Sequence, residues 1–229
     1  MIASVHIADV GAARTLRVLA RPPKPTSVAG LRHADVAIAV PLRRSLVPRA
    51  QPGRVALFGY WDDDDSLAHF LADHPLARLL AVGWQARLEP VRAWGSWPGL
   101  ADDLPRSRTV TGEGPVAVLT LARTRLTQLR RFLATSLAAE RRAREAPGLL
   151  WGTALVRPPF FATCSLWGDA EAAATFAYGL EESAHPGAID ADRAKPFHHR
   201  SAFVRFRPYA SQGGLNGGNP LPRGWMARV

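Results

Sequence analysis

Short apolar runs alternate with helical stretches along the chain, and this pattern is clearest in the second half. Between Leu126 and Glu145, apolar residues recur at the spacing of a helix, which Pro147 and Gly148 end. Strands are predicted at residues 116–122, 149–156, 160–167 and 201–209, and further helices at residues 169–178 and 185–195. The second half is therefore expected to follow the order β-α-β-β-α-β.

The first half predicts the same order with less regular patterning. A helix over residues 12–19 is stopped by the prolines of residues 22–25. Strands are predicted at residues 4–10, 36–40, 55–61 and 85–94, and short helices at residues 66–73 and 74–80. Residues 42–53 are rich in Pro and Arg and form a predicted loop that the second half lacks.

Four consecutive aspartates, Asp62 to Asp65, precede the helix predicted at residues 66–73. Carboxylates at the start of a helix accept hydrogen bonds from its free N–H groups and favour the positive end of its dipole. A site for a hard cation is the alternative, but consecutive helical residues project in different directions. The sequence therefore favours a capping role.

The two halves also share a sequence repeat. Trp61 and Phe70 are nine positions apart, and so are Trp167 and Phe176. A His-Pro pair follows each Phe, and a strand that begins Val-Arg follows each His-Pro pair; these are His74-Pro75 with Val91-Arg92, and His185-Pro186 with Val204-Arg205. A repeat of roughly a hundred residues is too long for a solenoid unit. It predicts two related half-domains.

The order β-α-β-β-α-β is the ferredoxin-like supersecondary pattern. The expected fold class is α+β, with two ferredoxin-like halves that pack face to face or join into an α/β barrel. Two copies within one chain, or two chains in a dimer, would complete such a barrel. The expected boundaries are residues 1–97 for the first half, 98–113 for a linker, 114–210 for the second half and 211–229 for a Gly/Pro-rich tail.

The charge of the chain is strongly positive but dispersed. The formal net charge is +10, from 29 Lys+Arg against 19 Asp+Glu, and Lys24 and Lys195 are the only lysines. The densest arginine cluster, between Arg123 and Arg144, lies on a predicted helix whose other face is apolar. That placement favours a solvated helix face, so no specific nucleic-acid partner is expected.

Several chemistries are disfavoured by what the sequence lacks. The single cysteine, Cys164, excludes an intramolecular disulfide and a cysteine-based zinc site. No apolar stretch is long enough for a transmembrane segment, and the first residues do not resemble a signal peptide, so a cytoplasmic protein is expected. Nucleophile-elbow, dinucleotide-binding and P-loop motifs are absent. Reducing equivalents, if the chain needs them, would come from a separate electron donor.

The apolar motifs of the second half, taken in order, resemble those of a known family. They are Gly148–Gly152, Ala162–Trp167, Ala184–Pro186 and Ser201–Phe206. Together they resemble the spheroidene monooxygenase (carotenoid 2-ketolase) family, which is similar to the dimeric α/β-barrel monooxygenases. The resemblance covers most of the chain and is strongest over residues 147–209. It implies an oxidoreductase that uses haem iron.

The resemblance leaves the substrate open, because a fold does not set a function. A small apolar molecule or a secondary metabolite is expected, and homo-oligomer formation is left open. The alternative is a non-catalytic or cofactor-free α/β-barrel protein that binds a small molecule.

The implied haem requires an axial ligand, for which a neutral histidine imidazole is suited. His185 lies in the half with the stronger resemblance, beside a predicted helix, and is the first candidate metal ligand. His199 and His198, which precede the last predicted strand, are the alternatives. Their adjacency sends the two side chains in different directions, so only one of them can face a given pocket.

Other residues of the same half are candidates for contacts with the implied haem. Arg205 and Arg207 could pair with its propionates, because guanidinium groups match carboxylates. Phe160 and Phe203 could line the pocket if they face inward. The alternative is ordinary strand-surface charge for the arginines and plain core packing for the aromatic residues.

Overall fold

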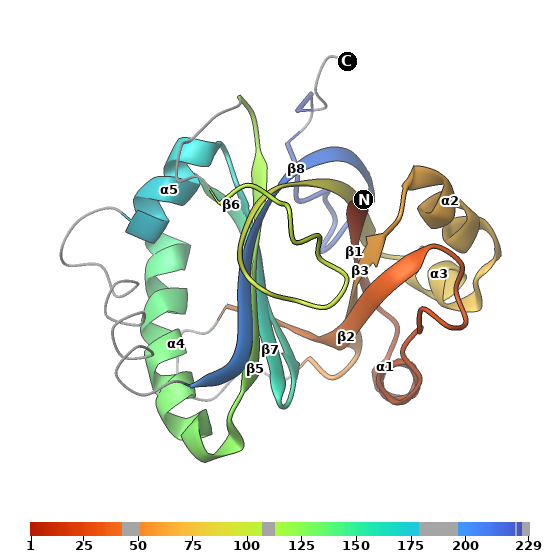
Figure 1. The fold of residues 1–229 in the computed structure, drawn as a ribbon, viewed down its shortest axis with the longest axis horizontal. Helices are drawn as coiled ribbons and strands as arrows, with labels where there is room; N and C mark the ends of the chain where they lie inside the picture. Colours follow the sequence, from red (N-terminus) through yellow and green to blue (C-terminus); the bar gives the residue numbers. More distant parts are fainter. Residues whose placement is uncertain (43–50, 107–112, 179–196, 223, 226–229) are drawn as a thin grey trace.

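Eight antiparallel strands form a closed barrel with helices on its outside (Figure 1). The structure is a computed structural model and describes residues 1–42, 51–106, 113–178, 197–222 and 224–225. The first half comprises β1 (Ile2–Asp9), α1 (Ala12–Ala20), β2 (Leu31–Pro41), β3 (Arg54–Trp61), α2 (Asp64–Asp73), α3 (Pro75–Leu80) and β4 (Trp84–Gly95). The second half comprises β5 (Val116–Thr124), a short 3-10 turn (Leu126–Gln128), α4 (Leu129–Glu145), β6 (Leu149–Arg157), β7 (Phe160–Trp167), α5 (Ala170–Tyr178) and β8 (His198–Gly213).

The strand pairing joins the two halves into one barrel. Its order is β1-β3-β2-β6-β7-β5-β8-β4, so each half contributes four adjacent strands. One junction pairs β2 with β6, from Ile38 opposite Val156 to Pro41 opposite Thr153. The other junction pairs β4 with β8 along most of both strands. The predicted mixed fold with a barrel is confirmed, and one chain supplies all eight strands.

The barrel interior is a packed core. Alternate residues of each strand point inward, such as Leu119 and Leu121 of β5 and Val204 and Phe206 of β8. Aromatic rings meet across the interior, and the ring centroids of Phe58 and Phe206 are 5.6 Å apart. Such interdigitated side chains fill a barrel of eight strands.

The helices cover the outer face of the barrel in two groups. In the first half, α1, α2 and α3 bury the outward side chains of β3, including Leu57 and Trp61. In the second half, α4 and α5 lie together on the opposite side of the molecule (Figure 1). There Trp167 packs against Ala170 and Ala173 of α5. The first-half helices and α5 therefore bury apolar faces against the sheet. Along the stripe predicted for α4, Leu137 is buried, whereas Leu126 is 64% exposed.

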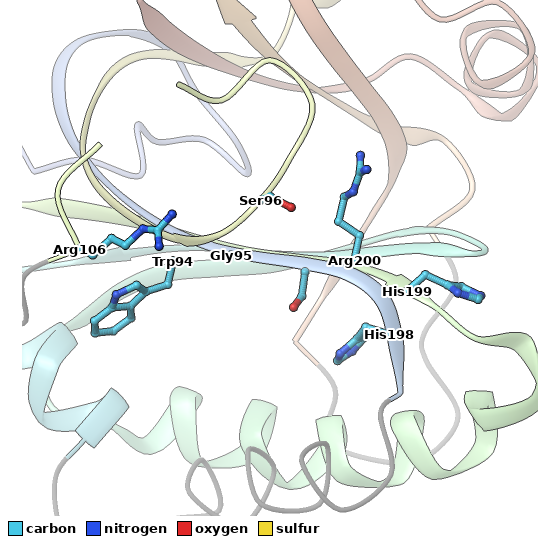
Figure 2. Close-up of a pocket in the computed structure, with 8 residues that line it drawn as sticks. Trp94, Gly95, Ser96, Arg106, His198, His199 and Arg200 are labelled. Atoms are coloured by element: carbon cyan, nitrogen blue, oxygen red, sulfur yellow. The ribbon is translucent and has the colours of Figure 1, made fainter. Parts of the chain in front are cut away.

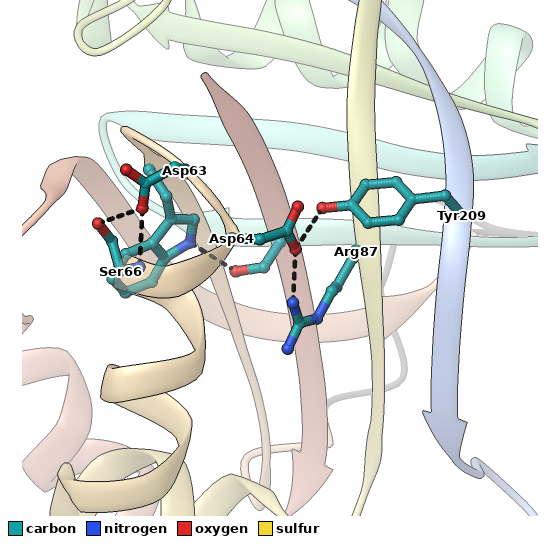
Figure 3. Close-up of polar contacts among 7 residues, drawn as sticks. Asp63, Asp64, Ser66, Arg87 and Tyr209 are labelled. Atoms are coloured by element: carbon teal, nitrogen blue, oxygen red, sulfur yellow. Dashed lines mark hydrogen bonds and ion pairs between the residues drawn. The ribbon is translucent and has the colours of Figure 1, made fainter.

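The start of α2 confirms the predicted capping role of the aspartates (Figure 3). The Asp63 carboxylate accepts hydrogen bonds from the backbone N–H of Ser66 at 2.8 Å and from its hydroxyl at 2.7 Å. Asp64 points elsewhere and accepts hydrogen bonds from Arg87 and from Tyr209, the latter at 2.9 Å. No group of three metal-ligating side chains occurs within the described ranges.

The predicted tail is more ordered at its start than expected. Strand β8 begins at His198 and extends to Gly213, beyond both predicted ends. Leu215 and Leu221 are buried with the barrel core. The indole N–H of Trp84 donates to Ser211 at 2.8 Å and to Asn219 at 3.1 Å. The first part of the tail therefore packs over one end of the barrel.

Several sequence-based expectations lie outside what the structure describes, among them most of the loop predicted over residues 42–53. The predicted helix over residues 185–195, and His185 with it, falls within residues 179–196.

Across the described parts of the chain, no helix has both the length and the apolar character needed to cross a membrane.

Candidate functional site

A groove of about 620 Å³ runs along the last residues of β4 and the first residues of β8 (Figure 2). Its lining residues are Trp94, Gly95, Ser96, Arg106, His198, His199, Arg200 and Ser201. This volume lies in the range of small-molecule and cofactor sites, about 300–1,000 Å³. Both alternative histidine ligands predicted from the sequence are therefore at one groove.

The side chains of the groove lie on two sides of the sheet. Figure 2 shows His198 and Trp94 on the side that faces α4. Arg200 and Arg106 extend to the other side, and His199 points away from both. The groove therefore combines aromatic and imidazole groups on its helix side with guanidinium groups on its opposite side.

His198 is held among aromatic rings between the sheet and α4. Its ring centroid lies 5.4 Å from that of Phe132 on α4 and 5.8 Å from that of Phe197. His198 is half-buried, whereas its neighbour His199 is exposed. Of the two adjacent histidines, His198 is the one that faces the covered side of the sheet.

Phe203 and Arg205 follow His198 on the outer face of β8. They alternate with Val204 and Phe206, which point into the barrel, as the period of a strand requires. Arg205 is 7% exposed although it is charged, and Phe203 is 37% exposed. In the ladder, Phe203 lies opposite Trp94. The outer face of β8, with Trp94 of β4 beside it, thus places an imidazole, two aromatic residues and a buried guanidinium along one surface.

Arg207 shares this face but is engaged elsewhere. Its guanidinium forms an ion pair with Glu89 of β4, with its Nε 2.9 Å from the Oε2 atom of that carboxylate. The side chain is 60% exposed. This arrangement is the ordinary strand-surface charge that the sequence offered as the alternative for Arg207.

Phe160 lies on the other side of the sheet. It begins β7 and points into the barrel with Ala162 and Cys164, and its ring centroid is 5.7 Å from that of Trp97. The structure therefore does not bring Phe160 and Phe203 into one pocket. The reason is geometric, because the sheet separates inward from outward side chains.

A second polar cluster, which the sequence analysis did not identify, lies at one mouth of the barrel. Asp35 of β2 is 8% exposed and accepts a hydrogen bond from the Trp97 indole at 2.7 Å. The His33 Nε2 atom is 3.1 Å from the same carboxylate oxygen. A carboxylate just before the apolar residues 36–40 was the available signal, but Trp97 lies at the end of the first half, 62 residues away.

Tyr60 of β3 adds a buried hydroxyl to this mouth. Its side chain is fully buried, and its hydroxyl has no hydrogen-bond partner among the described residues. Burial, followed by the negative charge of Asp35, raises the pKa of Tyr60 well above its usual value. Tyr60 is therefore neutral across the physiological range of pH.

The residues on the outer face of β8 fit the needs of a haem. An imidazole can ligate iron, aromatic side chains can contact a porphyrin, and a guanidinium can pair with a carboxylate. His198, Trp94, Phe203 and Arg205 supply these groups on one side of the sheet. His185, the first candidate ligand from the sequence, lies outside the described residues.

Comparisons with known proteins agree with the barrel and with the sequence resemblance. No family model matches the chain. Over 90% of its length and 79% of the other chain, the structure is similar to an aldoxime dehydratase in complex with butyraldoxime, with a TM-score of 0.52 and 10% identity. A protein described as a monooxygenase from Fusobacterium nucleatum aligns over 93% of this chain and 95% of its own, with a TM-score of 0.42 and 9% identity.

A match in sequence tells more about the family of this chain than the structural similarities do. The spheroidene monooxygenase of Rubrivivax gelatinosus is 30% identical over an alignment of 174 residues that covers 72% of this chain. The match spans 64% of the length of that relative. The resemblance of this chain to spheroidene monooxygenase, which the motifs of the second half indicated, is thus confirmed.

Proposed function

We propose that this chain is a haem-dependent monooxygenase of a small molecule, and that its haem binds between the outer face of β8 and α4. The observation that carries this proposal is the position of His198, whose side chain faces α4 beside a groove of about 620 Å³. The similarity to spheroidene monooxygenase supports the oxygenase class.

The side chains at this surface would play different roles in haem binding. His185 stays the first candidate ligand from the sequence, and His198 is the alternative that the described geometry favours. Either imidazole would bind iron in its neutral form, so haem binding weakens as pH falls. Arg205 would pair with a haem carboxylate, because the planar guanidinium fork matches the geometry of a carboxylate. When bound, the haem would supply the redox-active iron of an oxygenase.

The proposed substrate is a small apolar molecule or a secondary metabolite. Trp94 and Phe203 lie opposite each other in the ladder and offer apolar surface next to the groove. Spheroidene is the substrate that the name of the sequence relative gives, and for this chain we propose only the monooxygenase class of reaction. Electrons would come from a separate donor.

We also propose that the chain is organised as two ferredoxin-like units. The strand order within each half is β4-β1-β3-β2 and β8-β5-β7-β6, which supports two ferredoxin-like units. They would comprise residues 1–97 and 114–210, with a linker over 98–113 and a tail over 211–229. Superposition of the two units should bring Trp61 onto Trp167. Because one chain closes the barrel, association with a second copy is not needed to complete it.

The absorption spectrum of protein produced with adequate iron tests the proposed cofactor. A Soret band that copurifies with the protein is expected. His185→Ala, His198→Ala and His199→Ala should then be compared, with His69→Ala as the control, because His69 is an exposed residue of α2. Loss of the band in only one of the first three variants identifies the ligand.

Two outcomes would contradict the proposal. Wild-type protein that binds no haem after reconstitution would favour the cofactor-free or non-catalytic α/β-barrel alternative. A Soret band that all four variants retain unchanged would exclude these histidines as axial ligands. Oxidation of a candidate substrate, coupled to a supplied reductant, then tests the reaction itself.

A further inference from the structure

Trp97 closes the mouth of the barrel that Asp35 occupies. It belongs to the segment of residues 96–106, which follows β4 and crosses in front of the barrel strands (Figure 1). The Trp97 side chain is 4% exposed and packs with the barrel core. The centroid of its ring lies 5.7 Å from that of Phe160, which points into the barrel. The segment is therefore inserted into the barrel end and does not merely lie on it.

The Asp35 carboxylate holds the inserted indole. The Trp97 Nε1–H donates to its Oδ2 atom at 2.7 Å. Arg123 of β5 lies 3.8 Å from the other oxygen of Asp35, and its guanidinium also lies 5.4 Å from the centre of the Trp97 ring. A hydrogen bond to a buried charged acceptor is among the stronger ones in proteins. Asp35 of the first half, Arg123 of the second half and Trp97 therefore form one connected cluster.

The backbone of the segment also lies close to the barrel at Gly99. A Cβ atom at this position would lie 2.6 Å from the Cβ of His33 and 3.2 Å from that of Tyr60. Gly99 has a φ of +80°, a conformation that glycine adopts without steric cost. The segment thus contacts β2 and β3 through its main chain.

The same segment forms part of the groove. Ser96 and Arg106, near its two ends, line the groove, and the Ser96 N–H donates to the carbonyl of Ser201 on β8 at 3.1 Å. The Ala93 N–H donates to the carbonyl of Pro105 at 3.1 Å. The seating of Trp97 at the barrel mouth and the position of the groove wall are therefore linked through one short stretch of chain.

We propose that Asp35 is a positioning residue for the groove, which acts through Trp97 to hold residues 96–106 in place. Its role in haem binding rests on the proposed function of the groove. Asp35 lies on β2 of the first half, whereas the groove lies on β4 and β8, so it acts on the groove from the barrel mouth and not as one of its lining residues.

Thiol labelling measures the seating of the segment in protein without haem. Leu100→Cys places a reporter thiol at a partly buried position that packs on the core. The native Cys164 is 1% exposed, and burial raises the pKa of its thiol to about 12, so it contributes little reactivity. The labelling rate is compared in this background for Asp35→Ala, Asp35→Asn, Trp97→Phe and the control Glu89→Gln.

We expect Asp35→Ala and Trp97→Phe to label about ten-fold faster or more, because each removes one side of a hydrogen bond to a charged group. Asp35→Asn keeps a neutral acceptor for the indole but loses the charge, so it should label at a rate between that of the parent and that of Asp35→Ala. Glu89→Gln breaks an exposed ion pair of the same barrel and should not change the rate. An unchanged rate in Trp97→Phe, which keeps an aromatic ring, would overturn the proposal, as would equal acceleration by Glu89→Gln.

Haem titration separates this proposal from the proposed function. Asp35→Ala should weaken haem affinity while the Soret position of the bound form stays that of the wild type, and Asp35→Asn should weaken it less. Faster labelling with unchanged haem affinity would overturn the positioning role. Failure of the wild type to bind haem would contradict the proposed function but would leave the labelling result as the test of the segment itself.

Discussion

The ring of Trp167 stacks on the ring of Phe176, with 5.0 Å between their centroids. The equivalent pair of the first half, Trp61 and Phe70, has a centroid distance of 4.9 Å. Each Trp ends a strand, and each Phe lies on the helix that follows, so the nine-residue spacing repeats as a structural contact. The indole N–H groups donate to serine hydroxyls, Ser4 for Trp61 and Ser165 for Trp167, at 2.9 Å in both cases.

Replacing either tryptophan with alanine should strongly destabilise the fold. Trp61→Ala and Trp167→Ala should each lower the free energy of unfolding by about 3–5 kcal/mol, because a large buried aromatic is deleted and its cavity does not fully collapse. Denaturant unfolding measures the loss. Leu16→Ala is the control, since Leu16 is 64% exposed on α1 and its loss should cost less than about 0.5 kcal/mol. A loss below about 1 kcal/mol for both tryptophans contradicts the anchoring role.

His6 should make the stability of the fold depend on pH. It is 2% exposed on β1, and its Nε2 atom lies 3.0 Å from the hydroxyl of Ser4. Burial is the largest cause that lowers the pKa of His6 to about 4; Arg87 also lowers it, and a hydrogen bond with Gln85 opposes the shift. The folded protein therefore keeps His6 neutral at pH values where the unfolded chain already binds a proton.

The sign of this effect follows from proton binding. Between the unfolded pKa of His6, about 6.5, and its folded pKa, about 4, the unfolded chain binds more protons, so stability falls as pH falls. The accumulated loss is about 3 kcal/mol at pH 4. The pH dependence of unfolding in wild type and His6→Gln isolates this contribution from that of the carboxyl groups. Parallel curves for the two proteins between pH 7 and 4.5 would contradict it.

The order of elements could be predicted from the sequence, whereas the direction in which each side chain points could not. Alternation along β8 placed Phe203, Arg205 and Arg207 on one face, as observed. Whether that face looks into the barrel depends on how the sheet closes, which long-range pairings such as Ile38 with Val156 determine. The sequence therefore does not reveal that Phe160 points into the barrel whereas Phe203 points outward, which keeps the two rings out of one pocket.

Contacts made by connecting segments were also not predictable. Pro, Gly, Asp and Ser residues between 95 and 114 indicate a linker, and nothing local shows that Trp97 inserts beside Asp35. Similarly, the composition of the tail indicates an irregular segment, although Leu215 and Leu221 pack with the core. In both cases an apolar residue in a polar segment was the only local signal.

Cys164 should not react with thiol reagents in the folded protein. Its side chain points into the barrel core and is 1% exposed, and burial raises the pKa of its thiol to about 12. The thiolate is the reactive form, so modification at pH 8 should require unfolding. A thiol-reactive chromophore added with and without denaturant measures this. Stoichiometric labelling of the native protein within minutes would show that the barrel interior is accessible.

Gly99 and Gly114 offer a matched pair of substitutions that isolates the packing of the segment over the barrel mouth. Both have positive φ angles, +80° and +87°, so alanine at either position carries a similar backbone cost of about 1–2 kcal/mol. Among the described residues, a Cβ at Gly114 would have no neighbour within 4 Å, whereas at Gly99 it would lie 2.6 Å from the Cβ of His33. Gly99→Ala should therefore lower the free energy of unfolding by about 1–3 kcal/mol more than Gly114→Ala, the range for overpacking.

The same pair should differ in the seating of Trp97. In the Leu100→Cys background, Gly99→Ala should accelerate thiol labelling, because relief of the clash with His33 and Tyr60 moves the segment away from β2 and β3. Gly114→Ala lies outside residues 96–106 and should leave the labelling rate at the parent value. Equal unfolding free energies for the two variants, measured in denaturant, would show that the segment does not pack against the barrel mouth. In that case the indole of Trp97 could not be held beside Asp35 by the arrangement described.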